Sequence, residues 1–394
     1  MSPNLSENSP SNYKRVGVVY NPSSRGGQAQ TLFKAVVLPL LERFFGDRLV
    51  KCMPTQCRDD GTRCAFQLIV EDHCDYIISA GGDGSTFNVL NGLVRGCLYL
   101  DQDNKTRQSL MMTTNSGSSS HSPLPVAFAV LPIGSGNDLH KTLGVDVNVS
   151  DLKFFEKYIH MLAEGGEVIH ADIGRVEYTK DHTGVIEETV NDEHIPTQYR
   201  ENKACQLDSH DKGVRFYMNE SSFGISTSIL NAVNNSSISK EINYNIQTFW
   251  KQLTYVNPSV KVEVDGKVVK DGISQLVCVG NGKCFGGGMR INPNASITSE
   301  AFDVCVLHNL RLWNVPYIFY QIQYGTHGNN PLASLYERVK TIKASKNPET
   351  IDDVYLECDG EVVGKLPATY TIMPSCVKFV VPKNSIEHSN FMNK

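Results

Sequence analysis

Residues 81–84 read Gly-Gly-Asp-Gly, and this turn constrains the fold more than any other segment of the chain. The apolar, β-branched segment 76–80 precedes it and predicts a buried parallel strand. A helix is predicted directly after the turn, with Ser85 as its cap. Because glycine has no Cβ atom, a ligand can approach the backbone amides of the turn closely. A strand, a glycine turn and a helix in this order predict an α/β domain with an anion site.

Asp83 is the exceptional member of this turn. A carboxylate repels phosphate unless a cation or a proton transfer involves it. The turn therefore predicts a nucleotide, magnesium and a hydroxyl group that accepts a phosphoryl group. A lone Gly-Gly-Asp-Gly is only moderately specific, since tight turns use glycine and aspartate for ordinary reasons.

Two further turns suited to phosphate follow predicted strands. Segment 16–20 predicts a first buried strand that leads into 21–27, and the predicted strand 126–131 leads into 132–139. Strands that alternate with helices predict a parallel sheet, and ligands bind along its carboxyl edge. All three turns are therefore expected at one edge, where the guanidinium of Arg25 and backbone amides could donate to phosphate oxygens.

Composition limits the classes of protein to consider. The chain has 394 residues, 40% of them hydrophobic, so it can bury the cores of about two domains. Its net charge of −5 provides no basic field for nucleic acid. Eleven cysteines without a C-x-x-C pair predict free thiols in a reducing compartment. Residues 1–12 resemble neither a signal peptide nor an anchor, and no apolar run approaches the roughly 20 residues of a spanning helix, so we expect a cytoplasmic protein.

The pattern of the chain changes after about residue 165. Short strands separated by hairpin-like turns then dominate, and they predict an antiparallel β domain, a sandwich. Two polar segments interrupt the domains as insertions. The predicted organisation is a disordered tail 1–13, an α/β domain 14–165 with an insertion at 101–123, a β-sandwich domain 166–383 with an insertion at 179–212, and a tail 384–394.

Several motifs in fixed order resemble those of the diacylglycerol kinase catalytic-domain family of lipid kinases, which includes sphingosine, ceramide and bacterial lipid kinases. The resemblance extends over roughly residues 14–383, apart from the two insertions. It rests on the turns at 19–27, 81–93 and 131–139 and on the segments 172–174, 219–224, 282–289 and 359–361. The P-loop motif and the H-R-D and D-F-G motifs of protein kinases do not occur.

The resemblance implies a Rossmann-like nucleotide-binding domain, a C-terminal antiparallel β-sandwich and an active site in the cleft between them. It also implies ATP and Mg²⁺ as cofactors, with Asp83 organising the magnesium ion. Either Glu361 or Asp83 would be the catalytic base, and we favour Glu361. The residues that would bind the nucleotide are Asn21, Pro22, Ser23, Ser24, Arg25, Thr55, Gly81, Gly82, Asp83, Gly84, Ser85, Thr86, Phe87, Gly134, Ser135, Asn137 and Asp138.

Two departures from the family pattern concern the metal and the substrate. Bacterial members carry an Asp-Asp-Gly run for a structural magnesium ion, whereas here Glu300 and Asp303 would substitute in part. Sphingosine kinases carry acidic residues after the glycine that matches Gly224, and segment 225–230 has none. A buried cationic amine would lack a partner there, so a neutral lipid such as diacylglycerol or ceramide is favoured.

The sequence thus predicts an ATP-dependent lipid kinase that acts on a hydroxyl of diacylglycerol or ceramide. The alternatives are a sphingosine or long-chain-base kinase, a soluble-substrate kinase similar to NAD kinase, and a non-catalytic lipid- or nucleotide-binding protein. The expected partner is a lipid at a membrane surface, reached by peripheral association, and no nucleic acid; the oligomeric state stays open.

Three segments also have a purely structural interpretation. The aromatic segment 310–320 either lies at a membrane interface or forms a helix packed on the sandwich. Without the resemblance, Asn137 and Asp138 would be a helix cap, and Glu361 would be a solvent-facing residue beside a common Asp-Gly turn.

Overall fold

The computed structural model describes residues 9–101, 123–184, 195–200, 202, 206–234, 254–383 and 385. Most of the predicted tails and of the insertion 101–123, and part of the insertion 179–212, lie outside the described residues. The chain divides into two units, the first comprising residues 1–173, 190–207 and 373–394 and the second residues 174–189 and 208–372.

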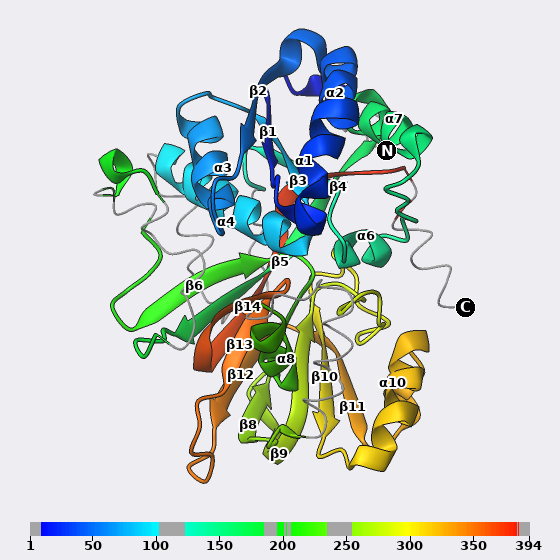
Figure 1. Ribbon diagram of the computed structural model, residues 1–394. Coiled ribbons are helices and arrows are strands. Elements are labelled where there is room, and N and C mark those ends of the chain that lie inside the picture. The colour runs from blue at the N-terminus through cyan, green and yellow to red at the C-terminus, as the bar shows by residue number, and fades with distance from the viewer. Residues whose placement is uncertain are drawn as a thin grey trace, which may run out of the picture. The chain divides into compact units, whose positions relative to one another are not determined.

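A parallel sheet forms the centre of the first unit (Figure 1). Its strands are β1 (Val16–Tyr20), β2 (Leu49–Pro54), β3 (Tyr76–Gly81), β4 (Ala127–Pro132) and the end of β14 (Glu361–Val381), in the order β2-β1-β3-β4-β14. Strands β1, β3 and β4 are buried throughout, as their continuous apolar runs predict. Tyr20 pairs with Ala80, and Ala80 pairs with Leu131, so these three strands end at the same level.

Helices cover both faces of this sheet. On one face, Phe33, Leu41 and Phe155 pack in a common core with the strands. On the other face, Leu68 lies against Gly17 of β1. The helical segments are α1 (Gln28–Leu32), a π-helical turn (Phe33–Val37), α2 (Leu38–Phe45), α3 (Gly61–Val70), α4 (Asp83–Leu100), α6 (Asp138–Thr142), α7 (Leu152–His160) and a second π-helical turn (Met161–Gly165).

Helices α3 and α4 cross at very close range. A Cβ atom at Gly92 of α4 would lie 2.3 Å from the carbonyl oxygen of Thr62 in α3, so only glycine fits at this crossing. Helix α3 begins at Gly61, so Thr62 at this crossing lies in its first turn, and Leu68 further along the helix contacts β1.

The second unit consists mainly of antiparallel strands. They are the end of β5 (Glu167–Thr179), β6 (Lys212–Tyr217), β7 (Glu220–Gly224), β8 (Ser259–Val264), β9 (Lys267–Gly280), β10 (Phe302–His308), β11 (Ala333–Val339), β12 (Thr341–Lys346), β13 (Tyr355–Cys358) and most of β14. The order β11-β10-β9-β7-β13-β14 forms one sheet path, and β8 and β12 add to it through β9 and β14. The predicted fold class, an α/β unit followed by an antiparallel β unit, is confirmed.

Two helices of the second unit bear on function, α8 (Ile225–Asn234) and α10 (Val315–Tyr324). The aromatic segment expected at 310–320 forms a short 3-10 turn (Leu312–Asn314) and most of α10. Ile318 and Ile322 of α10 are buried in a core with strands β9 and β10, so the helix does pack on the β unit. Within the described residues, no helix combines the length and the apolar content that crossing a membrane requires.

Candidate active site

The three predicted turns meet at the carboxyl edge of the parallel sheet, because β1, β3 and β4 end at the same level. Asn21 follows β1, and its backbone N–H donates to the carbonyl of Ala80 at 3.1 Å. The side-chain amide of Asn21 donates to the hydroxyl of Ser85 at 3.3 Å. Thr55 follows β2, and its N–H donates to the carbonyl of Tyr20 at 2.9 Å. The residues predicted on the first two turns and on β2 are therefore neighbours.

Asp83 joins the second turn to the third. Its Oδ2 accepts the backbone N–H of Asp138 at 3.1 Å, and its Oδ1 accepts that of Leu139 at 3.2 Å. Both donors belong to the first turn of α6. The two turns also touch through glycines, since a Cβ atom at Gly134 would lie 2.3 Å from the Cα atom of Gly82. The Asp83 carboxylate, which is unusual in a phosphate-binding turn, therefore connects the second turn to the third through hydrogen bonds.

The start of α4 differs from the predicted one. The helix begins at Asp83, with Gly82 as its N-cap and no capping side chain. Ser85 therefore lies within the first turn and does not cap the helix, because the N–H of Thr86 already bonds the carbonyl of Gly82 at 3.0 Å. The N–H groups of residues 83–85 come before the first hydrogen bond within the helix, so they have no acceptor inside α4. The N-terminus of α4 therefore lies at the edge where the turns meet, as an anion site requires.

The predicted nucleotide residues fall into two groups. Thr86 and Phe87 are buried, and the Thr86 hydroxyl bonds the Gly82 carbonyl, so these side chains anchor α4. The loop after β1 is more accessible, and Arg25 adopts a left-handed conformation with a φ of 54°. The half-buried or exposed predicted residues at this edge are Asn21, Pro22, Ser23, Ser24, Arg25, Thr55, Gly82, Asp83, Gly84, Ser85 and Ser135.

In the second unit, Glu361 follows a tight hairpin between β13 and β14. Cys358 pairs with Glu361, and the two residues between them, Asp359 and Gly360, have φ values of 47° and 85°. Positive φ at both central positions is the type I′ geometry that favours Asp-Gly. Glu361 is half-buried at the first position of β14, so the Asp-Gly turn is confirmed, whereas a fully solvent-facing Glu361 is not.

Buried acids fix this hairpin, and the sequence analysis did not single them out. The Asp359 carboxylate accepts three backbone N–H bonds, from Met218 at 2.9 Å and from Asn219 and Glu220 at 3.0 Å. Oε2 of Glu357 accepts the N–H of Gly360 at 2.9 Å. A polar residue in the otherwise apolar strand β13 was the available signal for Glu357.

Burial changes the protonation of these acids. It raises the pKa of Glu357 and that of Asp359 to about 7, although hydrogen bonds oppose the shift. Glu357 also bonds the carboxyl group of Glu220, and a bond between two carboxyl groups needs a proton. The pair therefore shares a proton near neutral pH.

Comparisons with known proteins agree with this arrangement. Residues 15–176 match the diacylglycerol kinase catalytic domain, and residues 219–381 match the YegS C-terminal NAD kinase beta sandwich-like domain. The chain belongs to the diacylglycerol kinase catalytic-domain family. The family is one of lipid kinases, so this chain is a lipid kinase, and a kinase of this kind uses an ATP-type phosphoryl donor and usually a divalent metal.

Two curated relatives and two solved structures extend over nearly the whole chain. The diacylglycerol kinase of Bacillus subtilis (strain 168) is 23% identical over 95% of this chain and 98% of its own length. The diacylglycerol kinase of Staphylococcus carnosus (strain TM300) is 21% identical over 94% of this chain and 96% of its own length. Two crystal structures from Bacillus anthracis str. Sterne align with TM-scores of 0.61 and 0.57, the second being of a diacylglycerol kinase. The first structure is 19% identical and covers 94% of this chain and 98% of its own chain. The second is 18% identical and covers 95% of this chain and 99% of its own. Both therefore support the fold.

The family's structural-magnesium residues have weak counterparts here. Asp303 on β10 is 8% exposed, burial raises its pKa to about 6, and its Oδ1 accepts the N–H of Arg338 at 3.2 Å. Glu300 is exposed in the segment before β10. A metal role for Glu300 and Asp303 stays a prediction.

Glu357→Gln should flatten the pH dependence of stability of the second unit. The folded-state pKa of about 7 exceeds the ordinary value of 4.5, so between these pH values the folded protein keeps a proton that the unfolded chain has released. Stability therefore falls as pH rises through this window, by up to about 3 kcal/mol from this residue. Glutamine keeps the acceptor for Gly360 and does not titrate.

Urea denaturation at about pH 5 and about pH 8, followed by circular dichroism, measures this slope. The variant should lose part of the slope and keep the part due to Asp359, whose pKa is also raised. An unchanged slope would contradict the assignment of the raised pKa to Glu357.

Proposed function

We propose that the protein transfers the γ-phosphoryl group of ATP, with Mg²⁺, to a hydroxyl group of a neutral lipid such as diacylglycerol or ceramide. One observation carries the proposal. Asn21 bonds Ser85, and Asp83 bonds the backbone of Asp138 and Leu139, so three glycine-bearing turns form one site. Such a set of turns at the carboxyl edge of a parallel sheet suits a nucleotide.

The residues at this edge have the chemistry for a triphosphate. The N-terminus of α4 supplies backbone N–H groups, and Arg25 supplies a guanidinium. The carboxylate oxygens of Asp83 are the hard ligands that Mg²⁺ prefers, so this residue fits the ion. When bound, ATP and Mg²⁺ would supply the phosphoryl group and neutralise its charge.

The acceptor hydroxyl must lose a proton, and Glu361 suits this role better than Asp83. Both carboxylate oxygens of Asp83 already accept backbone N–H groups of α6. Glu361 lies half-buried on a hairpin whose turn Asp359 and Glu357 hold by accepting backbone N–H bonds. A base needs a defined position, and this hairpin supplies one for Glu361.

The preference for a neutral lipid rests on α8. Residues 225–230 carry no acidic side chain that could pair with a sphingoid amine. The acid linked to this helix is Glu357, through Ser222, whose hydroxyl donates to Glu357 and bonds Ser226 at 2.9 Å. Glu357 is 1% exposed, and its raised pKa of about 7 makes it a weak counter-ion.

A lipid panel tests the proposal. The protein is incubated with labelled ATP and Mg²⁺ and, separately, with vesicles that contain diacylglycerol, ceramide or sphingosine. We expect label in the organic phase with diacylglycerol or ceramide. Label with sphingosine alone would favour a long-chain-base kinase, and label in NAD without any lipid product would overturn the proposal. ATP binding without any product would indicate a binding protein.

A lipid substrate lies in a bilayer, and we propose that α10 and the turn before it contact the membrane. Trp313, Tyr317, Tyr320 and Tyr324 follow a helical spacing and are 71%, 62%, 64% and 60% exposed. Trp and Tyr have the amphipathic rings that favour membrane interfaces. Segment 304–336 contains no acidic residue and one basic residue, Arg311, so its charge suits a surface with anionic headgroups.

A Tyr320→Ala/Tyr324→Ala double variant should bind vesicles of phosphatidylcholine and phosphatidylglycerol about tenfold more weakly. The two rings are exposed neighbours, with centroids 5.0 Å apart, so their loss should leave the fold intact. The matched control is Ile351→Ala, because Ile351 is 91% exposed in the same unit and outside α10. Co-sedimentation measures the binding, and equal loss in both variants would refute a specific role for α10.

A further inference from the structure

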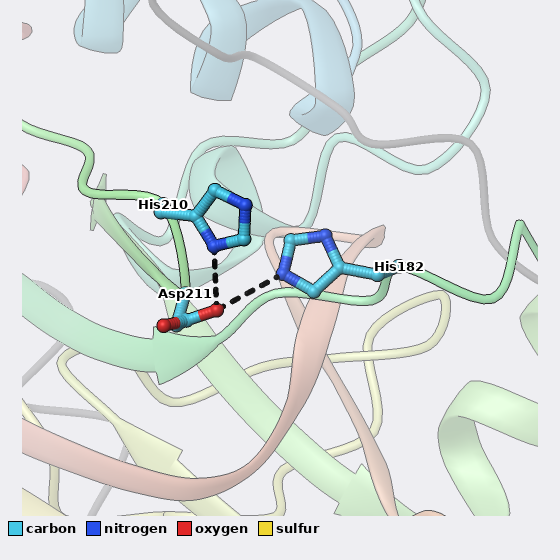
Figure 2. Close-up of side chains that lie close together, drawn as sticks. All are labelled: His182, His210 and Asp211. Carbon is cyan, nitrogen blue, oxygen red and sulfur yellow. Dashed lines mark hydrogen bonds and ion pairs between the residues drawn. The ribbon is translucent and has the colours of Figure 1, made fainter.

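Three exposed side chains that the proposed function does not use lie together in the second unit, namely His182, His210 and Asp211 (Figure 2). Each offers one ligand atom, and these atoms all lie within 4.8 Å of one another. Oδ1 of Asp211 lies 2.8 Å from Nδ1 of His210 and 3.5 Å from Nε2 of His182. Among the described residues this is the only such group of three or more His, Cys, Asp or Glu side chains.

The backbone holds two of these residues in one tight turn. The N–H of Ser209 donates to the carbonyl of Lys212 at 2.8 Å, and the N–H of Lys212 donates to the hydroxyl of Ser209 at 3.1 Å. His210 and Asp211 are the two residues inside this turn, directly before β6. Their side chains therefore start from a fixed position at the end of the β5–β6 pair, where Thr179 pairs with Lys212.

The third residue, His182, is fixed from the other strand. The neighbouring Asp181 is 5% exposed, and its Oδ1 accepts the N–H and the hydroxyl of Thr183 at 3.2 and 2.7 Å. Lys365 on β14 lies 3.4 Å from the same Oδ1. This turn carries the His182 ring toward the Asp211 carboxylate, and the two histidine rings lie 5.1 Å apart.

The charges around the cluster favour a cation between the three groups. Lys180 and Lys212, which flank it in sequence, have carboxylate partners of their own, Asp208 at 3.8 Å and Glu177 at 2.8 Å. Without a metal ion, Oδ1 of Asp211 can accept a hydrogen bond from each imidazole, and this His-Asp-His group is the alternative that the metal titration below tests.

We propose that His182, His210 and Asp211 bind a transition-metal ion of the Zn²⁺ type. Zinc–nitrogen and zinc–oxygen bonds of about 2.0–2.2 Å in a tetrahedron imply ligand separations of about 3.3 Å. The observed separations lie on both sides of this value, so small rotations of exposed side chains suffice. Three protein ligands leave a fourth position for water. Two imidazoles favour zinc or copper over Mg²⁺, which prefers oxygen ligands.

The site goes beyond the proposed phosphoryl transfer and has a structural consequence of its own. His182 and His210 are 28 residues apart in the sequence, so an ion bound to both would close a loop of the chain. Such a link restricts the unfolded chain, as a metal clip or disulfide does.

Calorimetric titration of the tag-free, chelator-treated full chain with Zn²⁺ tests the proposal. We expect one Zn²⁺ per chain, and at least about tenfold weaker binding in His182→Gln and in His210→Gln. His170→Gln is the matched control, because His170 is an exposed histidine of β5 outside the cluster. Binding that is absent, or unchanged in both cluster variants, would overturn the proposal.

Cobalt(II) identifies the ligands by absorption spectroscopy. Nitrogen and oxygen ligands give visible d–d bands without the near-ultraviolet charge-transfer band of a thiolate. We expect the first pattern, lost in His182→Gln and unaffected by excess Mg²⁺. A thiolate band would assign the metal to cysteines such as the exposed Cys57 and would refute the histidine site.

Discussion

Asp83→Ala is expected to abolish lipid phosphorylation, with a loss of at least about 1000-fold, and to weaken ATP binding as well. The variant removes the acceptor for the N–H groups of Asp138 and Leu139, so the third turn loses its connection to the second. Two hydrogen bonds to a charged group contribute about 3 kcal/mol together, so the first unit should also be less stable. Turnover, ATP affinity and thermal unfolding are the three measurements.

Asp83→Asn should lose almost as much activity as the alanine variant. This result would show that the two accepted hydrogen bonds matter, and not only the size of the side chain. An asparagine offers one acceptor oxygen, and its NH₂ group would face the second backbone donor. The matched control is Asp151→Ala, because Asp151 also accepts a helix N-terminal N–H, that of Lys153 at 2.9 Å, at the start of α7. The control should lose about 1 kcal/mol and keep its activity. If the two alanine variants lost the same activity, Asp83 would have no special role in the site.

The sequence was sufficient for the turns because their signals are local. A β-branched strand, a glycine turn and a helix at 76–93 identify an edge of a parallel sheet without any knowledge of distant residues. The role of Asp83 was not predictable in the same way. Its partners, Asp138 and Leu139, lie 55 and 56 residues further along the chain, and only the register of β3 against β4 brings them together.

The wrong prediction for Ser85 has a related cause. A serine near the start of a helix is the common cap, but an extended Gly82 allows α4 to begin earlier, at Asp83. The buried Glu357 and the cluster of His182, His210 and Asp211 were also missed. Glu357 accepts a hydrogen bond from Ser222, 135 residues earlier in the chain, and His182 lies 28 residues before His210, so no spacing rule connects these side chains.

Glu361→Gln should leave ATP binding and stability unchanged and reduce lipid phosphorylation by about 100- to 10000-fold. Glutamine keeps the size of the side chain and cannot accept the proton of the lipid hydroxyl. Asp359 and Glu357 hold the turn of the hairpin through backbone N–H groups, so the backbone should keep its position in the variant. Initial rates with the preferred lipid, at saturating ATP, measure the loss.

The pH–rate profile decides between a base and a merely structural residue. If Glu361 takes the proton, the rate of the unmodified protein falls at acid pH as the base becomes protonated, and the glutamine variant loses this limb. Glu263→Gln is the matched control, a half-buried carboxylate of β8 in the same unit that pairs with Lys261 at 2.9 Å, and it should keep both rate and profile. Full turnover in Glu361→Gln, or an acid limb that persists in it, would assign the proton to Asp83 and would require a lipid pose over the glycine turn.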